Sequence, residues 1–344
     1  MSASQRHIVL FFAFAAVIMP SQGMARNSEG LLDVIETPNN GIPAITIPDG
    51  TFDAVLKAEA PLSLVGEGAS VPLQPEWTPL SGGRFRTTVR VPAGTSPGMY
   101  ALVAGGDGAE DTNQRSVCVR ESFPEYYVIA HLTDVHMGAQ RNVRSSADVF
   151  RDLLAFVNAS EASFAVITGD LTDSGEMFQF KQFLDILDTC TIPTFVCAGN
   201  HDRKELNYER VFGPDCYMFR FGKDGYISYD TKDFTMADES GAQDSDLQIF
   251  RRAVKASRWS VGLTHRYEPE MGLRAQIVLF VDDPLDHLIF GHWHRVNTDA
   301  ERAVPWGTTP MTVTPAAFDG MLRFFDMTES GIKPREPQKA APTE

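Results

Sequence analysis

Residues 127–136 read YVIAHLTDVH, an apolar run of strand length that ends in a carboxylate and an imidazole. Four later stretches repeat this arrangement of a buried strand followed at once by polar side chains. They are Phe164–Thr168 before Gly169-Asp170, Pro193–Ala198 before Gly199-Asn200-His201-Asp202, Trp259–Leu263 before His265, and Leu285–Phe290 before Gly291-His292-Trp293-His294. In layered α/β folds, strand ends meet at one edge of the sheet, where ligands bind. The sequence therefore predicts that five segments deliver Asp, Asn and His side chains to one small volume.

The donors in these segments are oxygens and imidazoles without cysteine, a set that suits a pair of transition-metal ions. Asp134 and His136 stand one residue apart, and alternate residues of an extended tip point the same way. Asp170 can bridge two ions through its two oxygens, and Asn200 adds a neutral amide oxygen. The complete set of candidate metal ligands is Asp134, His136, Asp170, Asn200, His265, His292 and His294.

Two metal ions about 3.5–4 Å apart hold a phosphoryl group and make a bridging hydroxide available as the nucleophile. His201 is not needed as a ligand, so we expect it to protonate the leaving oxygen or to stabilise developing charge. We expect Asp202 to orient His201, and Asp173 to begin a turn or to order the ligands' surroundings. Arg203 and Arg266 are either contacts for one substrate phosphate or solubilising surface residues.

The ordered set Asp134-x-His136, Gly169-Asp170-x-x-Asp173, Gly199-Asn200-His201-Asp202, His265 and Gly291-His292-x-His294 resembles the calcineurin-like metallophosphoesterase superfamily over residues 127–325. The resemblance implies a four-layer α/β/β/α sandwich with a dinuclear centre, and imidazole and carboxylate donors accept Fe, Mn, Zn or Co. One ion would be held by Asp134, His136, Asp170 and His294. The other would be held by Asp170, Asn200, His265 and His292, and His201 would be the catalytic histidine.

The resemblance also separates this chain from the purple acid phosphatases. These carry a Tyr ligand where this chain has Asp173, and their first motif ends in Gly where this chain has His136. We therefore expect no purple centre, and we favour hydrolysis of small phosphodiesters. The alternatives are a phosphomonoesterase or protein phosphatase, and a binding scaffold with an inactive domain, which the complete ligand set disfavours.

Composition restricts the partners. The chain has 45 acidic against 30 basic residues and a net charge of −15, with no basic cluster. A nucleic-acid polymer is bound by a basic face, so we expect no such partner.

The chain divides into four expected regions. Residues 1–25 have the basic start, apolar run and small residues of a secretory signal peptide, which predicts export to the periplasm or the medium; an uncleaved anchor is the alternative. Residues 28–122 show short alternating runs between Gly/Pro turns, typical of a small all-β sandwich of unknown partner. Residues 126–328 form the α/β catalytic domain, and the polar residues 329–344 predict a disordered tail. Once the signal is removed, no apolar stretch long enough to span a membrane remains.

Helical periodicity predicts a helix capped by Ser145-Ser146, a second over Glu176–Leu187 and a third after Asp246. His131 and His287 lie inside apolar runs, which favours core histidines, and Trp306 and Phe318 are expected in the core. Export would permit disulfides. A Cys190–Cys216 bridge is the favoured pair if one exists, with Cys197 a buried thiol.

Overall fold

The computed structural model describes the chain except residues 1–29, 107–108, 141–142, 231–240, 268–276, 282, 296–306 and 343–344. The expected signal peptide at residues 1–25 and Trp306 therefore lie outside the described residues. Among the described helices, none has the length and apolar character needed to cross a membrane.

The N-terminal part consists of strands and one short 3₁₀ helix. The strands are β1 (Ile35–Thr37), β2 (Ala44–Thr46), β3 (Thr51–Leu56), β4 (Leu62–Gly66), β5 (Ala69–Pro72), β6 (Thr78–Pro79), β7 (Phe85–Arg90), β8 (Gly98–Gly106) and β9 (Ala109–Val119), and the 3₁₀ helix is η1 (Ser81–Gly83). They form two sheets, in the orders β1-β3-β7-β6 and β2-β9-β8-β4-β5. Side chains from both sheets, including Phe52, Leu64, Leu102 and Val117, share one apolar core. This region is thus a β-sandwich.

The C-terminal part alternates strands and helices. The strands are β10 (Tyr127–Leu132), β11 (Ala162–Thr168), β12 (Thr194–Cys197), β13 (Tyr217–Phe221), β14 (Asp224–Ser228), β15 (Ser260–Leu263), β16 (His287–Phe290), β17 (Met311–Val313), β18 (Met321–Thr328), β19 (Gly331–Pro334) and β20 (Gln338–Lys339). The helices are α1 (Ser146–Asn158), α2 (Met177–Leu187), α3 (Asn207–Phe212) and α4 (Gly241–Val254), with the short turns η2 (Asn200–Asp202), η3 (Ile277–Val281) and η4 (Ala317–Asp319).

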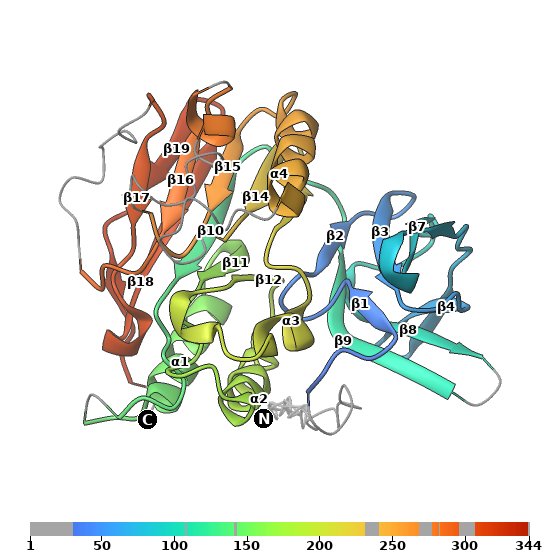
Figure 1. The fold of residues 1–344 in the computed structure, drawn as a ribbon, viewed down its shortest axis with the longest axis horizontal. Coiled ribbons are helices and arrows are strands. Elements are labelled where there is room, and N and C mark those ends of the chain that lie inside the picture. Colours follow the sequence, from blue (N-terminus) through green and yellow to red (C-terminus); the bar gives the residue numbers. More distant parts are fainter. Residues whose placement is uncertain are drawn as a thin grey trace, which may run out of the picture.

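Two sheets stack in the C-terminal part (Figure 1). The first has the order β12-β11-β10-β18-β19 and the second β13-β14-β15-β16-β17. An aromatic-rich core that includes Phe164, Phe195 and Tyr226 fills the space between them. Helices α1, α2 and α3 cover the outer face of the first sheet, and α4 and η3 cover the second. The predicted four-layer α/β/β/α sandwich is confirmed.

The expected helices and core histidines are present. Ser145 caps α1 by accepting a hydrogen bond from the Asp148 N–H, and α2 begins with a capping box. His131 is buried between the Thr314 and Thr168 hydroxyls, and burial lowers its pKa to about 3. Burial lowers the pKa of His287 to about 4. Both rings are therefore neutral core residues near pH 7.

Two expectations are wrong. The tail is not disordered, because β19 pairs with β18 along Phe325–Thr328 and β20 pairs with it at Met321 and Leu322. Backbone groups of β18 that are available for pairing and the hydrogen bond from Arg335 Nε to Asp326 (3.0 Å) hold this polar segment in place. Its composition does not reveal these contacts. Cys190 and Cys216 form no disulfide, and both are buried free thiols, as Cys197 is. All three lie against apolar cores, where a thiol packs as a small apolar side chain.

The N-terminal sandwich is joined to the edge of the first sheet by the segment Asn39–Ile42. The Gly41 carbonyl accepts a hydrogen bond from the Val196 N–H of β12 (2.8 Å), and the Asn39 side chain donates to the Phe212 carbonyl (2.9 Å). Gly41 has a φ of 147°, and a Cβ there would lie 2.4 Å from the Phe212 ring. The contact therefore requires glycine.

Replacement of Gly41 by Ala tests this contact. We expect Gly41→Ala to lower the free energy of unfolding by at least about 2 kcal/mol, because the methyl group overpacks against Phe212 and strains the backbone. The matched control is Gly68→Ala, where φ is also positive (69°) but no atom lies within 4 Å of the added Cβ. It should cost about 1 kcal/mol. Equal losses in urea denaturation would show that the contact with Phe212 does not require glycine at position 41.

Candidate metal centre

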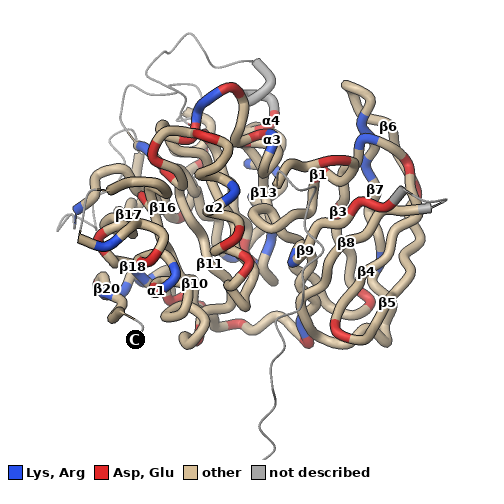
Figure 2. Tube along the Cα trace, turned by 90° about the horizontal axis from the view of Figure 1, so that it is seen from below, with Lys and Arg blue, Asp and Glu red and all other residues tan. Residues whose placement is uncertain are grey.

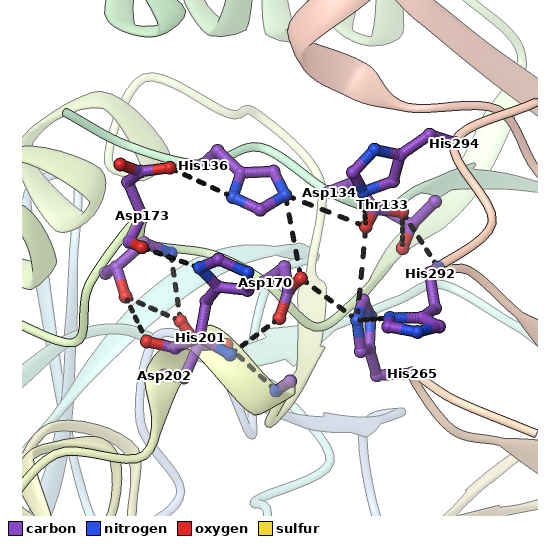
Figure 3. Close-up of polar contacts among 12 residues, drawn as sticks. Thr133, Asp134, His136, Asp170, Asp173, His201, Asp202, His265, His292 and His294 are labelled. Atoms are coloured by element: carbon purple, nitrogen blue, oxygen red, sulfur yellow. Dashed lines mark hydrogen bonds and ion pairs between the residues drawn. The ribbon is translucent and has the colours of Figure 1, made fainter. Parts of the chain in front are cut away.

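The five strand-end segments meet in one buried cluster (Figure 3). Asp134 and His136 follow β10, Asp170 follows β11, Asn200 and His201 lie in η2 after β12, His265 follows β15, and His292 and His294 follow β16. Asp134 and Asp170 are 0 % and 1 % exposed. The side chains that sequence reasoning placed together are therefore together.

Asp134, His136, Asp170 and His294 form the first group of ligand atoms, all within 4.8 Å of one another. His294 Nε2 lies 2.9 Å from Asp134 Oδ1, and His136 Nε2 lies 3.5 Å from Asp170 Oδ2. This group matches the first expected ligand set residue for residue.

Asp170, His265 and His292 form the second group. His265 Nε2 lies 3.2 Å from Asp170 Oδ2 and 3.3 Å from His292 Nδ1, so two imidazole nitrogens and a carboxylate oxygen converge. Asp170 belongs to both groups, the position that a bridging carboxylate would take. Its Oδ1 accepts a hydrogen bond from the His201 N–H (2.9 Å), and its Oδ2 faces His136 and His265.

Asn200 supplies the sharpest evidence that the residues fit a cation. Its Oδ1 is buried and has no hydrogen-bond partner in the described part of the chain. A buried oxygen without a partner is costly, and a metal ion would satisfy it. Asn200 lies directly before His201, whose N–H contacts Asp170.

Neighbouring groups orient two of the histidines. His265 Nδ1 donates to the Thr168 carbonyl (2.8 Å), so the neutral ring carries its lone pair on Nε2, which faces Asp170. His136 Nδ1 faces Asp173 Oδ1 at 3.4 Å, so its Nε2 points to the first group. Carbonyl and carboxylate partners of this kind are typical of metal-binding histidines.

The backbone at the ligands is unusual. Five of them have positive φ values, namely Asp134 (57°), His136 (47°), Asp170 (49°), His292 (69°) and His294 (56°). The expectation of an extended tip with alternating side chains is therefore wrong, because these turns are left-handed. Such conformations cost of order 1–3 kcal/mol each and concentrate at functional sites.

Two glycines allow the segments to approach one another. A Cβ on Gly199 would lie 2.1 Å from the Asp170 nitrogen, and one on Gly291 would lie 1.7 Å from Thr133 Oγ1. Each distance is far below a possible contact. The Gly residues that precede Asn200 and His292 are therefore required for packing.

The charges in the centre are strongly coupled. Burial alone would raise the pKa of Asp170, but His265 and His136 beside it hold that pKa well below its usual range. Burial opposes protonation of His265, but Asp170 and Asp134 raise its pKa to about 9. The carboxylates thus favour positive charge on the neighbouring rings, and a bound cation would provide that charge.

Residues 127–296 match the family of calcineurin-like phosphoesterases. The chain belongs to this family. A probable cyclic nucleotide phosphodiesterase of Coxiella burnetii is 25% identical over 209 residues, covering 54% of this chain and 82% of that protein. Purple acid phosphatase PPD1 from yellow lupin seeds has a similar fold, with a TM-score of 0.54 at 12% identity over 85% of this chain and 70% of the lupin chain. This calcineurin-like phosphoesterase is therefore a metal-dependent hydrolase.

His201 and Asp202 lie beside the phosphoesterase centre, but not as the pair that was expected. His201 Nδ1 lies 2.6 Å from the Asp173 carbonyl. The buried Asp202 carboxylate accepts bonds from the backbone N–H groups of Leu171 (3.1 Å), Thr172 (2.9 Å) and Gly199 (2.9 Å). Three N–H groups of the turns after β11 and β12 satisfy Asp202, so it joins those turns and does not orient the His201 ring.

Arg203 and Arg266 were both candidate contacts for a substrate phosphate, and the structure gives them different surroundings. The Arg203 guanidinium forms an ion pair with the buried Asp230 at the end of β14. Arg266 lies beside the centre, since its charge contributes to lowering the pKa of His292. Arg203 is thus already neutralised, whereas Arg266 stays a candidate phosphate contact.

Sequence reasoning missed two residues of the site. Thr133 Oγ1 donates to Asp134 Oδ2 (2.9 Å), and its place next to Asp134 was the only signal. Phe318 packs edge-on against the rings of His136 and His294, with centroids 5.4 and 5.2 Å apart. Phe318 was expected in the core, and nothing in its sequence context distinguishes it from a core residue.

Metal content tests the ligand assignment. After loading with Mn²⁺ and desalting, we expect Asp170→Ala to lose most bound metal, because Asp170 belongs to both groups. Asn200→Ala should lose part of it. The control His287→Gln alters a buried histidine outside the centre and should bind as much metal as the wild type. Wild-type metal content in Asp170→Ala, measured by mass spectrometry, would refute the assignment.

Proposed function

We propose that this protein hydrolyses small phosphodiesters with two metal ions held by the two ligand groups. The observation that carries the proposal is Asp170, whose Oδ2 faces both groups at 3.5 Å from His136 and 3.2 Å from His265. Asp134, His136, Asp170 and His294 would hold one ion. Asp170, Asn200, His265 and His292 would hold the other.

Such a pair of ions, when bound, supplies Lewis-acid activation of the phosphoryl group and a hydroxide nucleophile near neutral pH. The chain's residues do the rest. His265 is fixed by the Thr168 carbonyl and His136 by Asp173, so the ligand atoms are preorganised. The burial of Asp134 and Asp170 excludes water from the carboxylates, which strengthens their attraction for cations.

His201 is placed to move a proton. Its Nδ1–H donates to the Asp173 carbonyl, because a carbonyl only accepts, and its Nε2 is then the atom available to substrate. In the imidazolium form, Nε2–H can protonate the leaving oxygen, and in the neutral form Nε2 can accept a proton. Asp202 positions the two turns around His201, so it acts on structure and not on the proton.

Two observations favour a diester over a monoester. A diester carries one negative charge, whereas a monoester carries close to two near neutral pH, and the Arg203 guanidinium that could balance the second is paired with Asp230. The Coxiella relative is named a probable cyclic nucleotide phosphodiesterase. Export stays part of the proposal, supported by the pattern of residues 1–25.

Substrate preference tests the reaction. With Mn²⁺-loaded protein, we expect kcat/KM for bis-p-nitrophenyl phosphate to exceed that for p-nitrophenyl phosphate by at least about tenfold, or about 1.4 kcal/mol of transition-state binding. The opposite order would favour the phosphomonoesterase. Absence of turnover with every metal tested would favour the inactive scaffold.

Replacement of His201 by Asn separates proton transfer from metal binding. We expect His201→Asn to keep the wild-type metal content and to lose about 10²–10⁴-fold in kcat, the usual contribution of a positioned acid or base. His131→Asn, at a buried histidine outside the ligand groups, serves as the control for folding. Loss of bound metal in His201→Asn would show that His201 is a metal ligand.

A further inference from the structure

A pocket of about 430 Å³ lies between α1, η4 and the C-terminal segment. Its walls include Arg144, Val149, Asp152, Phe318, Lys339 and Ala340. In both Figure 1 and Figure 2, the C-terminal end of the chain lies beside α1. The segment expected to be disordered thus forms one wall of a concave site. Its volume falls in the range of small-molecule sites.

Phe318 connects this pocket to the metal centre. Its ring contacts the rings of His136 and His294, and its N–H donates to the Asp134 carbonyl (3.1 Å). The same residue lines the pocket. A group in the pocket would therefore lie one aromatic ring away from the first ligand group. The two sites are close enough to hold parts of one molecule.

The pocket has an apolar floor and a polar rim. Val149 and Ala340 are 9 % and 8 % exposed and belong to the core under α1, while Phe318 adds an aromatic wall. Arg144 forms an ion pair with Asp152 on this rim. The Lys339 stem packs near Gly320, where an added Cβ would lie 3.6 Å from its Cε. The structure gives the Lys339 ammonium no hydrogen bond or ion pair with another described residue.

We propose that this pocket binds one organic group of the phosphodiester substrate, a flat ring that carries hydrogen-bond acceptors. The inference rests on the proposed function, since the phosphoryl group would lie at the metal centre. The apolar floor fits the ring, and Lys339 fits an acceptor at its edge. Phe318 would serve as the common wall of the phosphoryl site and the ring site. Lys339 and Val149 would then determine specificity without touching the reacting atoms.

Calorimetric binding tests the pocket without relying on turnover. The probes are thymidine 5′-phosphate and methyl phosphate, which share the phosphoryl group and differ in the ring, and each is titrated into Mn²⁺-loaded protein. We expect thymidine 5′-phosphate to bind at least about tenfold more tightly. Lys339→Glu should weaken that nucleotide by about tenfold and leave methyl phosphate unchanged. The matched control Lys333→Glu makes the same charge change at an exposed position outside the pocket.

A second variant fills the pocket. Val149→Phe should abolish the preference for thymidine 5′-phosphate and keep the affinity for methyl phosphate, and Lys339→Glu decides the question if Val149→Phe does not fold. Equal affinities of the two probes for the wild type, or equal effects of Lys339→Glu on both, would overturn the proposal. Turnover of methyl p-nitrophenyl phosphate tests the proposed function separately. Binding of the nucleotide through Lys339 without any turnover would support the proposed pocket and contradict the proposed phosphodiesterase activity.

Discussion

The structure depends on the burial of two neighbouring carboxylates. Asp134 and Asp170 are almost completely shielded from water, and among the described residues both face imidazoles and neither pairs with Lys or Arg. Buried carboxylates in one site repel each other and lose hydration, and both effects raise their pKa. The histidines that surround them more than offset these effects, because the pKa values of Asp134 and Asp170 both lie below the usual range of a carboxyl group. Cations bound in this volume would offset the cost of several features of the site. These are the left-handed turns, the close glycine contacts and the Asn200 oxygen without a hydrogen-bond partner.

The sequence predicted most of the fold and the ligand set because these features follow from local patterns. The apolar run that begins at Tyr127 became β10 (Tyr127–Leu132), and Ser145 became the cap of α1. Strand ends of one sheet meet at one edge, so the sequence could place Asp134 and Asp170 together. His292 follows β16 of the second sheet, and the stacking of the two sheets brings it to the same site. The ordered motifs indicated the family because they too are local patterns of the sequence.

The misses arise where a residue's role depends on tertiary contacts. Asp202 accepts bonds from backbone N–H groups that follow two strands, and this was not visible in the tetrapeptide Gly199-Asn200-His201-Asp202. Phe318 looked like any core aromatic until η4 brought it against His136 and His294. The polar tail pairs with β18 because that strand has open backbone groups, which composition does not encode. Positive φ at Asp134 was also hidden, since non-glycine residues seldom adopt it.

The segment Asn39–Ile42 has a consequence for the chain as a whole. β12 is the outermost strand of its sheet, and the Gly41 carbonyl satisfies the Val196 N–H at that margin. A fragment that lacked the N-terminal sandwich would expose the edge strand β12 to solvent. Exposed edge strands can pair with strands from other molecules. The N-terminal sandwich thus covers part of this edge of the catalytic sheet.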